Sequence, residues 1–155
     1  MKRKNKRTCP CGSNAPAPQC CRPFLRGQAT PSPERLMRSR YTAYALGDVG
    51  YILATTHPLG PQFRLDSEEW ELDVRRFCQR TQFERLHVRK VEHAPGAAQA
   101  WVTFSAHILQ DNEALSINER SEFQMIGSRW FYHSGESVNA MDEINESSIK
   151  VDGAQ

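Results

Sequence analysis

The chain lacks any long apolar run. No stretch approaches the roughly 18–20 consecutive apolar residues that a membrane-spanning helix needs. The N-terminus also has no apolar segment like that of a secretory signal peptide, because its basic residues lead directly into Thr8-Cys9-Pro10-Cys11-Gly12. We therefore expect a cytoplasmic protein with no membrane partner. In that reducing compartment, clustered cysteines bind metal more often than they form disulfides.

Recognisable catalytic patterns are missing as well. The sequence has no internal repeat, no glycine-rich phosphate loop and no visible pairing of a nucleophile with a base. His57, which precedes a proline at a predicted helix end, and His107, within a predicted strand, are the polar candidates for a base. Surface or hydrogen-bonded histidines are commoner in such places. Whether the protein is an enzyme is left open by the sequence.

The charge is distributed unevenly along the chain. The 155 residues suit one ordinary domain with a small appendage, and seven Phe, four Tyr and three Trp can fill its core. The formal net charge is +2, but the five basic residues of the N-terminus account for +5, which leaves −3 for the remainder. We expect a mildly acidic domain with a basic arm that binds an acidic partner. The five residues are Lys2, Arg3, Lys4, Lys6 and Arg7.

Composition divides the chain into four segments. Residues 1–8 form a basic arm that we expect to be disordered, and residues 9–24 hold four of the five cysteines. Residues 25–134 carry the periodic patterns of a folded domain, and residues 135–155 form a polar tail.

The folded segment begins with helical patterns. Ser32 and Pro33 predict a helix start, and Gly47 predicts its end. A second, short helix is expected over residues 48–55. Ser67 is predicted to cap a third helix, whose apolar stripe includes Cys78 as a buried thiol.

After residue 82 the apolar period changes from 3.6 to 2. Alternation predicts strands around residues 86–88, 100–108, 117–124 and 129–133, with turns at Pro95-Gly96 and Gly127-Ser128. Helices followed by an antiparallel meander indicate an α+β fold, in which the helices cover one face of the sheet.

Four cysteines form two closely spaced pairs, Cys9 with Cys11 and Cys20 with Cys21. Zinc takes four such ligands in a tetrahedron with sulfur at about 2.3 Å, and the loop between the pairs is short enough to bring them together. With all four positions filled, the site is expected to be structural rather than catalytic. A related thiophilic ion, a redox switch and incidental cysteines are the alternatives.

The runs Cys9-Pro10-Cys11-Gly12-Ser13 and Gln19-Cys20-Cys21 resemble the SEC-C motif, which ends the preprotein translocase ATPase SecA and recurs on many small bacterial proteins. The resemblance implies that the four cysteines bind zinc. Such motifs usually continue with basic and aromatic residues, whereas residues 14–18 here are Asn, Ala, Pro, Ala and Pro. The basic arm would therefore have to supply the charge for docking.

Three further runs resemble the YchJ-like family of uncharacterised bacterial proteins. The resemblance covers roughly residues 9–134 and implies a nuclear-transport-factor-two-like (SnoaL-like) fold. In that fold, a cone of three helices packs on a curved antiparallel sheet, here preceded by the zinc knuckle. The runs are Cys21-Arg22-Pro23-Phe24, Leu36-Met37-Arg38-Ser39-Arg40-Tyr41-Thr42-Ala43-Tyr44, and Glu119-x-Ser121-x-Phe123 with Trp130-x-Tyr132.

Arg40 falls within the apolar stripe of the first helix, so it should point into the core. A buried cation needs a partner. Glu119 shares one strand face with Ser121 and an inward-pointing phenylalanine. We therefore predict that Arg40 and Glu119 meet inside the cone, near Tyr44 and Ser121. A structural ion pair and a ligand pocket both fit this arrangement.

Three functions remain in competition. The first is an interaction module that docks through the knuckle and arm on an acidic partner such as a ribosome, RNA or a chaperone. The alternative is a small-molecule-binding protein or enzyme that uses the interior pocket of the cone. The third is a homodimer through the sheet face, which an exposed apolar surface with Trp101 or Phe131 would support.

Overall fold

The computed structural model describes residues 8–140. Residues 1–7 of the predicted basic arm and residues 141–155 of the predicted polar tail lie outside the described residues.

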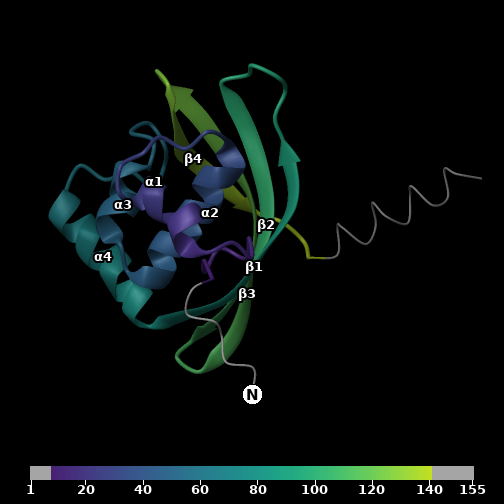
Figure 1. Cartoon of the computed structure of the whole chain (residues 1–155). Helices are drawn as coiled ribbons and strands as arrows, with labels where there is room; N and C mark the ends of the chain where they lie inside the picture. Colours follow the sequence, from purple (N-terminus) through teal and green to yellow (C-terminus); the bar gives the residue numbers. More distant parts are fainter. Residues whose placement is uncertain (1–7, 141–155) are drawn as a thin grey trace, which may run out of the picture.

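Short helices precede a four-stranded antiparallel sheet of order β1-β2-β3-β4 (Figure 1). The predicted α+β class and the order of the elements are therefore confirmed. The helical elements are η1 (Ala17–Gln19), α1 (Arg22–Leu25), α2 (Pro33–Leu46), α3 (Val49–Ala54) and α4 (Ser67–Gln79). The strands are β1 (Thr81–Glu92), β2 (Gln99–Gln110), β3 (Glu113–Ile126) and β4 (Arg129–Ser137).

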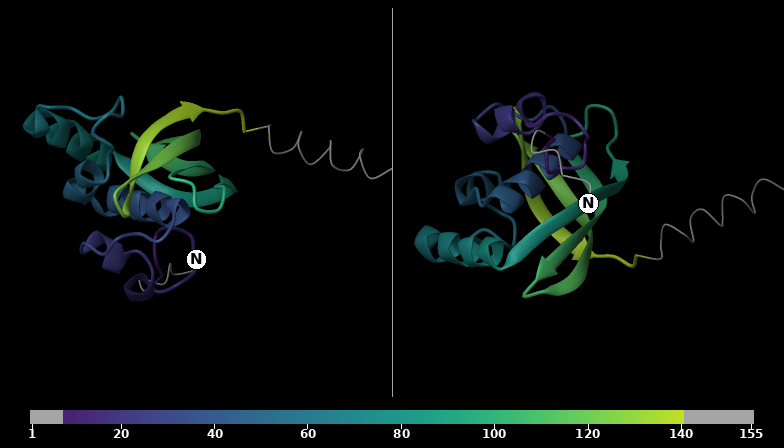
Figure 2. Two further views of the ribbon diagram at one scale, coloured as in Figure 1. Left: turned by 90° about the horizontal axis from the view of Figure 1, so that it is seen from above. Right: turned by 60° about the horizontal axis from the view of Figure 1, so that its bottom comes forward.

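The helices lie on one side of the curved sheet, as the cone fold requires (Figure 2). Alternate residues of β2 point inward and are buried, beginning at Ala100 and ending at Ile108. They pack against Leu36 and Met37 of α2 and against inward residues of β3 and β4. Register shifts interrupt the pairing of β1 with β2 and of β3 with β4, and such bulges increase the twist of a sheet.

Both predicted ends of α2 are confirmed. The Ser32 side chain accepts a hydrogen bond from the Arg35 amide at 3.2 Å, and Gly47 ends the helix with φ of 75°. The predicted cap of α4 is wrong by one residue. Asp66 is the N-cap, and its carboxylate accepts from the Glu69 amide, so Ser67 lies inside the helix.

Two further details differ from the sequence-based expectations. Cys78 is only half-buried, because the exposed helix α4 covers one edge of the core and has Trp70 as its buried residue. The elements η1 and α1 have three and four residues, too few to show a helical period in the sequence.

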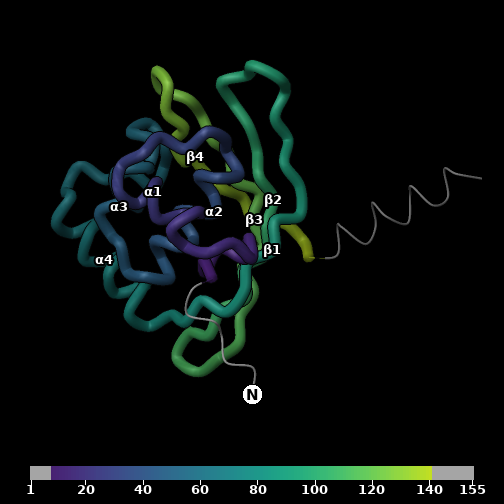
Figure 3. The backbone as a smooth tube through the Cα atoms, viewed as in Figure 1, coloured from purple at the N-terminus to yellow at the C-terminus, as the bar shows by residue number. Residues whose placement is uncertain are grey.

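The cysteine segment packs against the side of α2 that faces away from the sheet (Figure 2). Its backbone runs beside α2 and reaches β1 (Figure 3). There Arg38 of α2 donates a hydrogen bond to the Cys11 carbonyl at 2.8 Å. Gly12 lies so close to β1 that a Cβ would stand 3.0 Å from the Leu86 carbonyl oxygen, and its φ is 81°. Within residues 8–140, no helix has the length and apolarity needed to cross a membrane.

Candidate metal centre and cone cavity

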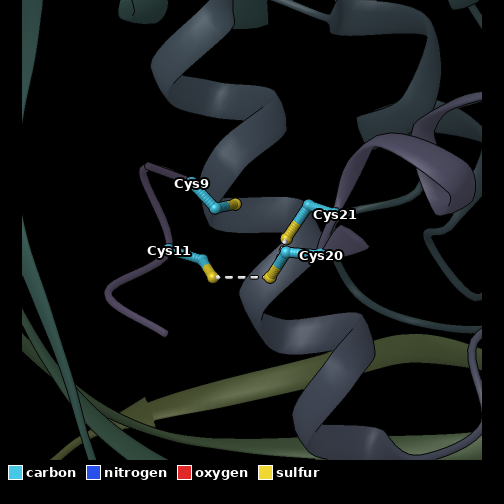
Figure 4. Close-up of side chains that lie close together, drawn as sticks. All are labelled: Cys9, Cys11, Cys20 and Cys21. Carbon is cyan, nitrogen blue, oxygen red and sulfur yellow. Dashed lines mark hydrogen bonds between the residues drawn. The ribbon is translucent and has the colours of Figure 1, made fainter. Parts of the chain in front are cut away.

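The metal-ligand candidates lie on two short segments that face each other. A bridge between Thr8 and Pro16, and a hydrogen bond of 2.8 Å from the Cys9 amide to the Ala15 carbonyl, close the loop that carries Cys9 and Cys11. Cys20 ends η1 and Cys21 starts α1. Figure 4 shows the two pairs of side chains pointing toward one another from opposite sides.

The four sulfurs form a compact buried cluster. They all lie within 4.8 Å of one another, with 3.4 Å between Cys11 and Cys20 and 3.9 Å between Cys20 and Cys21. Zinc bonds of 2.3 Å to sulfur imply a tetrahedron edge of about 3.8 Å, so these separations suit the ion. The exposed fractions are 3% for Cys9, 0% for Cys11, 4% for Cys20 and 2% for Cys21. Such closure would leave no room for a substrate at a metal ion held by the four sulfurs.

The close spacing of the four thiol groups also favours a bound cation. Hydrogen bonds from Cys11 and Cys21 lower the pKa of Cys9. The Cys21 thiol hydrogen-bonds to Cys11 and Cys9 and is buried, and both effects raise its pKa. Four thiolates at these distances repel one another strongly. A divalent ion would replace the shared protons and let all four sulfurs ionise.

Two hydroxyl groups surround the sulfurs. Ser13 Oγ accepts a hydrogen bond from the Ala15 amide at 3.2 Å and lies 3.1 Å from Cys20 Sγ. A thiolate at Cys20 can only accept, so the hydroxyl would be the donor to it. Thr42 Oγ1, on α2, lies 3.6 Å from Cys9 Sγ. Sequence reasoning missed both as contacts of the metal ligands, although both stand in runs that carry the family resemblance. Donors of this kind orient metal ligands and tune their basicity.

A separate cavity of about 160 Å³ lies inside the cone. All four predicted pocket residues, Arg40, Tyr44, Glu119 and Ser121, line it. Sequence reasoning missed Gln62 and Tyr132 in this wall. Tyr132 shares the buried face of β4 with Trp130, in a run that carries the resemblance. The other lining side chains are Met37, Tyr41, Phe77, Phe83, Phe104, Ala106, Ile117 and Phe123.

Arg40 is 5% exposed and is held by neutral groups. Its Nη1 donates to the Ile52 carbonyl at 3.0 Å and to Thr55 Oγ1 at 2.7 Å. A third, longer contact reaches Thr56 at 3.3 Å, and the guanidinium lies 4.5 Å from the centre of the Tyr132 ring. Burial raises the pKa of Tyr44, and the charge of Arg40 opposes that shift.

The Glu119 carboxylate is held by hydroxyl groups on the opposite part of the wall. Its Oε2 accepts from Ser121 at 2.5 Å and from Tyr132 at 3.4 Å. A Cβ on Gly135 would collide with this carboxyl group, so the bare backbone of β4 makes the space for it. Burial raises the pKa of Tyr132, and the charge of Glu119 adds to that shift.

The predicted direct contact between Arg40 and Glu119 is not formed, and among residues 8–140 no ion pair joins them. The Arg40 guanidinium instead hydrogen-bonds the carbonyl and hydroxyl groups at the end of α3. Tyr132 then lies between the two charged groups, with its ring against Arg40 and its hydroxyl against Glu119. The two side chains share the cavity without neutralising each other at close range.

Both histidine candidates lie outside this cavity. His57 is 6% exposed, and its Nδ1 accepts a hydrogen bond from the Leu59 amide at 3.0 Å. Burial lowers its pKa, and the neighbouring His133 lowers it further. His107 points to the outer face of β2, where Ser116 lies 3.1 Å from its Nδ1. Neither is placed to act on a molecule within the cone.

The fold and the cysteine cluster together define a class of protein: a cone-shaped α+β domain that carries an N-terminal SEC-C knuckle. The family model described as the YchJ middle NTF2-like domain matches residues 32–135. The chain belongs to the YchJ-like family, as its sequence motifs predict.

Relatives and solved structures support this placement. A UPF0225 protein of Deinococcus radiodurans is 36% identical over 126 residues, covering 80% of this chain and 85% of its own. One from Pectobacterium carotovorum is 34% identical over 135 residues, covering 84% of each. The solution structure of a SEC-C motif containing protein from Rhodopseudomonas palustris has a TM-score of 0.70 and 34% identity, covering 85% of this chain and 99% of its own.

A second solved structure confirms the fold alone. The crystal structure of a SEC-C motif containing protein from Psychrobacter arcticus has a TM-score of 0.71 at 22% identity. The match covers 87% of this chain and 85% of the other.

Proposed function

We propose that this protein is a zinc-stabilised docking protein, which binds RNA through its knuckle and basic arm. The observation that carries the proposal is the closed cluster of four buried sulfurs, all within 4.8 Å of one another. A metal enclosed in this way supports folding rather than chemistry. Zinc is the ion that this ligand set favours among common divalent metals in proteins. A reducing compartment such as the cytoplasm would keep the thiols available to it.

Charge indicates the kind of partner. The first 33 residues contain seven Lys and Arg residues and no Asp or Glu. A zinc ion with four thiolates carries a net charge of −2, so this part of the chain remains at about +5 with the metal bound. Besides the five arm residues, the seven include Arg22 and Arg26, both exposed on α1 and the turn after it.

The position of the metal centre links it to the arm. Thr8, the last residue of the arm, pairs with Pro16 in the closed loop of the knuckle. Exposed side chains of the knuckle are small or polar, so they offer little apolar area to a protein partner. Closely spaced cations with little apolar surface suit a phosphate backbone better than a protein groove. No feature for reading base sequence accompanies them.

The test is anisotropy titration of a labelled single-stranded RNA with the full metal-loaded chain. Affinity should fall steeply between 50 and 200 mM salt, because each neutralised phosphate adds about −0.7 to the logarithmic slope. A variant with all five arm cations changed to Gln should flatten that slope by about 3.5 units if each cation neutralises one phosphate. A Cys20→Ser/Cys21→Ser variant should bind more weakly, since the knuckle would no longer hold its basic surface in place.

The matched control replaces five exposed basic residues of the cone, including Arg75, Arg76 and Lys90, with Gln. It should retain the RNA affinity. Equal slopes for the native chain and the arm variant would remove the arm from the function. Binding of polyglutamate in preference to RNA would show that the partner is an acidic protein instead.

A further inference from the structure

The cone cavity has the form of a binding site that is independent of the knuckle. Its volume of about 160 Å³ is close to the roughly 150 Å³ of an apolar cavity that accommodates benzene. The floor consists of buried side chains such as Phe104, Ala106 and Phe123. The rim includes half-buried Tyr44 and exposed Gln62, so the cavity opens to solvent.

Most of the wall is apolar and aromatic. Phe77, Phe83, Phe104 and Phe123 line the cavity together with Ile117. The edge-to-face contact between Phe77 and Phe83, with 6.1 Å between centroids, places aromatic rings on one side. Such a lining favours a flat apolar group of about benzene size.

Two charged groups interrupt this wall, and each has unused capacity. All the hydrogen bonds of Arg40 to α3 and the following threonines come from Nη1. The guanidinium also hydrogen-bonds the Tyr44 hydroxyl. Together these partners leave part of its five N–H donors unused. Both hydroxyl donors to Glu119 reach Oε2, and Oε1 accepts no hydrogen bond from residues 8–140. The cavity therefore offers a cationic donor and an anionic acceptor, which Tyr132 separates.

This arrangement disfavours ligands that carry a charge of one sign only. An anion would be attracted by Arg40 and repelled by Glu119, and a cation would meet the reverse. A hydrocarbon would displace water from both groups and return no hydrogen bond, which is costly. A neutral group with a donor beside an acceptor satisfies both. We propose that the cone cavity binds a small neutral molecule that joins an apolar ring to a carboxamide.

In this arrangement the amide oxygen accepts from Arg40, the amide N–H donates to Glu119 Oε1, and the ring lies among the phenylalanines. The test compares four probes of one size by calorimetry and by amide chemical shifts of the metal-loaded chain. Benzamide should bind at least about tenfold more tightly than benzoate, benzylamine or toluene. Tighter binding of benzoate or toluene, or no binding of benzamide at millimolar concentration, would overturn the proposal.

Variants connect the binding to the cavity. Glu119→Gln keeps an acceptor for Ser121 and Tyr132 but removes the charge, so the ratio of benzamide to benzoate affinity should fall at least about tenfold. Glu113→Gln, at the exposed start of the same strand, is the matched control and should leave the ratio unchanged. Ala106→Leu should fill the cavity and abolish benzamide binding while the metal content stays the same. An unchanged ratio in Glu119→Gln would refute the role of the carboxylate.

Discussion

At the scale of single residues, Thr42 connects the cone to the metal centre. Its side chain is 2% exposed on α2, and its hydroxyl lies 3.6 Å from the Cys9 sulfur. With a metal bound, Cys9 is a thiolate and can only accept, so the hydroxyl must be the donor. A donor to a ligand sulfur stabilises its negative charge and holds it in position.

Replacing Thr42 with Val keeps the side-chain volume and removes this donor. We expect the affinity for zinc to fall about tenfold, in the range found for groups that support metal ligands. Competition with a chromogenic chelator measures this affinity. Thr103→Val, on the outer face of β2, is the matched control and should bind zinc like the native chain. Equal affinities for all three proteins would show that the Thr42 hydroxyl does not support the metal.

At the scale of elements, α2 differs from an ordinary surface helix because it is covered on two sides. On one side, Leu36, Met37 and Tyr41 pack into the cone. On the other side, the Thr42 side chain contacts the knuckle, and Arg38 hydrogen-bonds the backbone of the knuckle. Arg40, on the cone side, is held by the end of α3. The position of α2 therefore sets both the cavity and the metal centre, so its caps should matter for stability.

The caps of α2 and α4 give a direct comparison. Ser32→Ala should lower the free energy of unfolding by about 1 kcal/mol, because the Arg35 amide loses its acceptor. Asp66→Ala should cost a similar amount in α4. Ser67→Ala, one residue inside α4, should change stability by less than about 0.5 kcal/mol. Urea unfolding of the metal-loaded proteins measures all three. A loss in Ser67→Ala as large as in Asp66→Ala would contradict the observed cap.

At the scale of the whole molecule, the part of the chain that the structure describes has two separate buried clusters. One is the core of the cone, built around residues such as Leu36, Val102 and Phe123. The other consists of the four cysteines with Ala15 and Ala17 packed against them. The second cluster has too little apolar area to fold alone, so we expect a bound metal to supply most of its stability, on the order of 10 kcal/mol.

Removal of the metal with a chelator under reducing conditions should therefore unfold the knuckle and leave the cone folded. In amide spectra, the signals of residues 8–25 should collapse toward random-coil positions, while those of β2 and β3 stay dispersed. The Cys20→Ser/Cys21→Ser protein should give the same pattern without chelator. Loss of the sheet signals together with those of the knuckle would instead show one cooperative unit.

Much of this organisation was accessible from the residue pattern. The clustering of the four cysteines could be predicted because the spacing within each cysteine pair is a local property of the chain. The order of helices and strands followed from the change of apolar period after residue 82. Arg40 and Glu119 were placed in the cone because a residue's position in a helix or strand period gives its face. Their exact partners could not be predicted in this way.

Only the tertiary structure decided which distant segments contact each other. Periodicity shows that Arg40 points inward, but the nearest acceptor depends on where α3 ends and on how Tyr132 comes between Arg40 and Glu119. The same holds for Thr42, which lies 33 positions from Cys9 in sequence. The chain by itself determined which residues can bind a metal and which faces are buried, since both follow from local spacing. Packing determined what those residues touch, because a contact depends on where two elements meet in space.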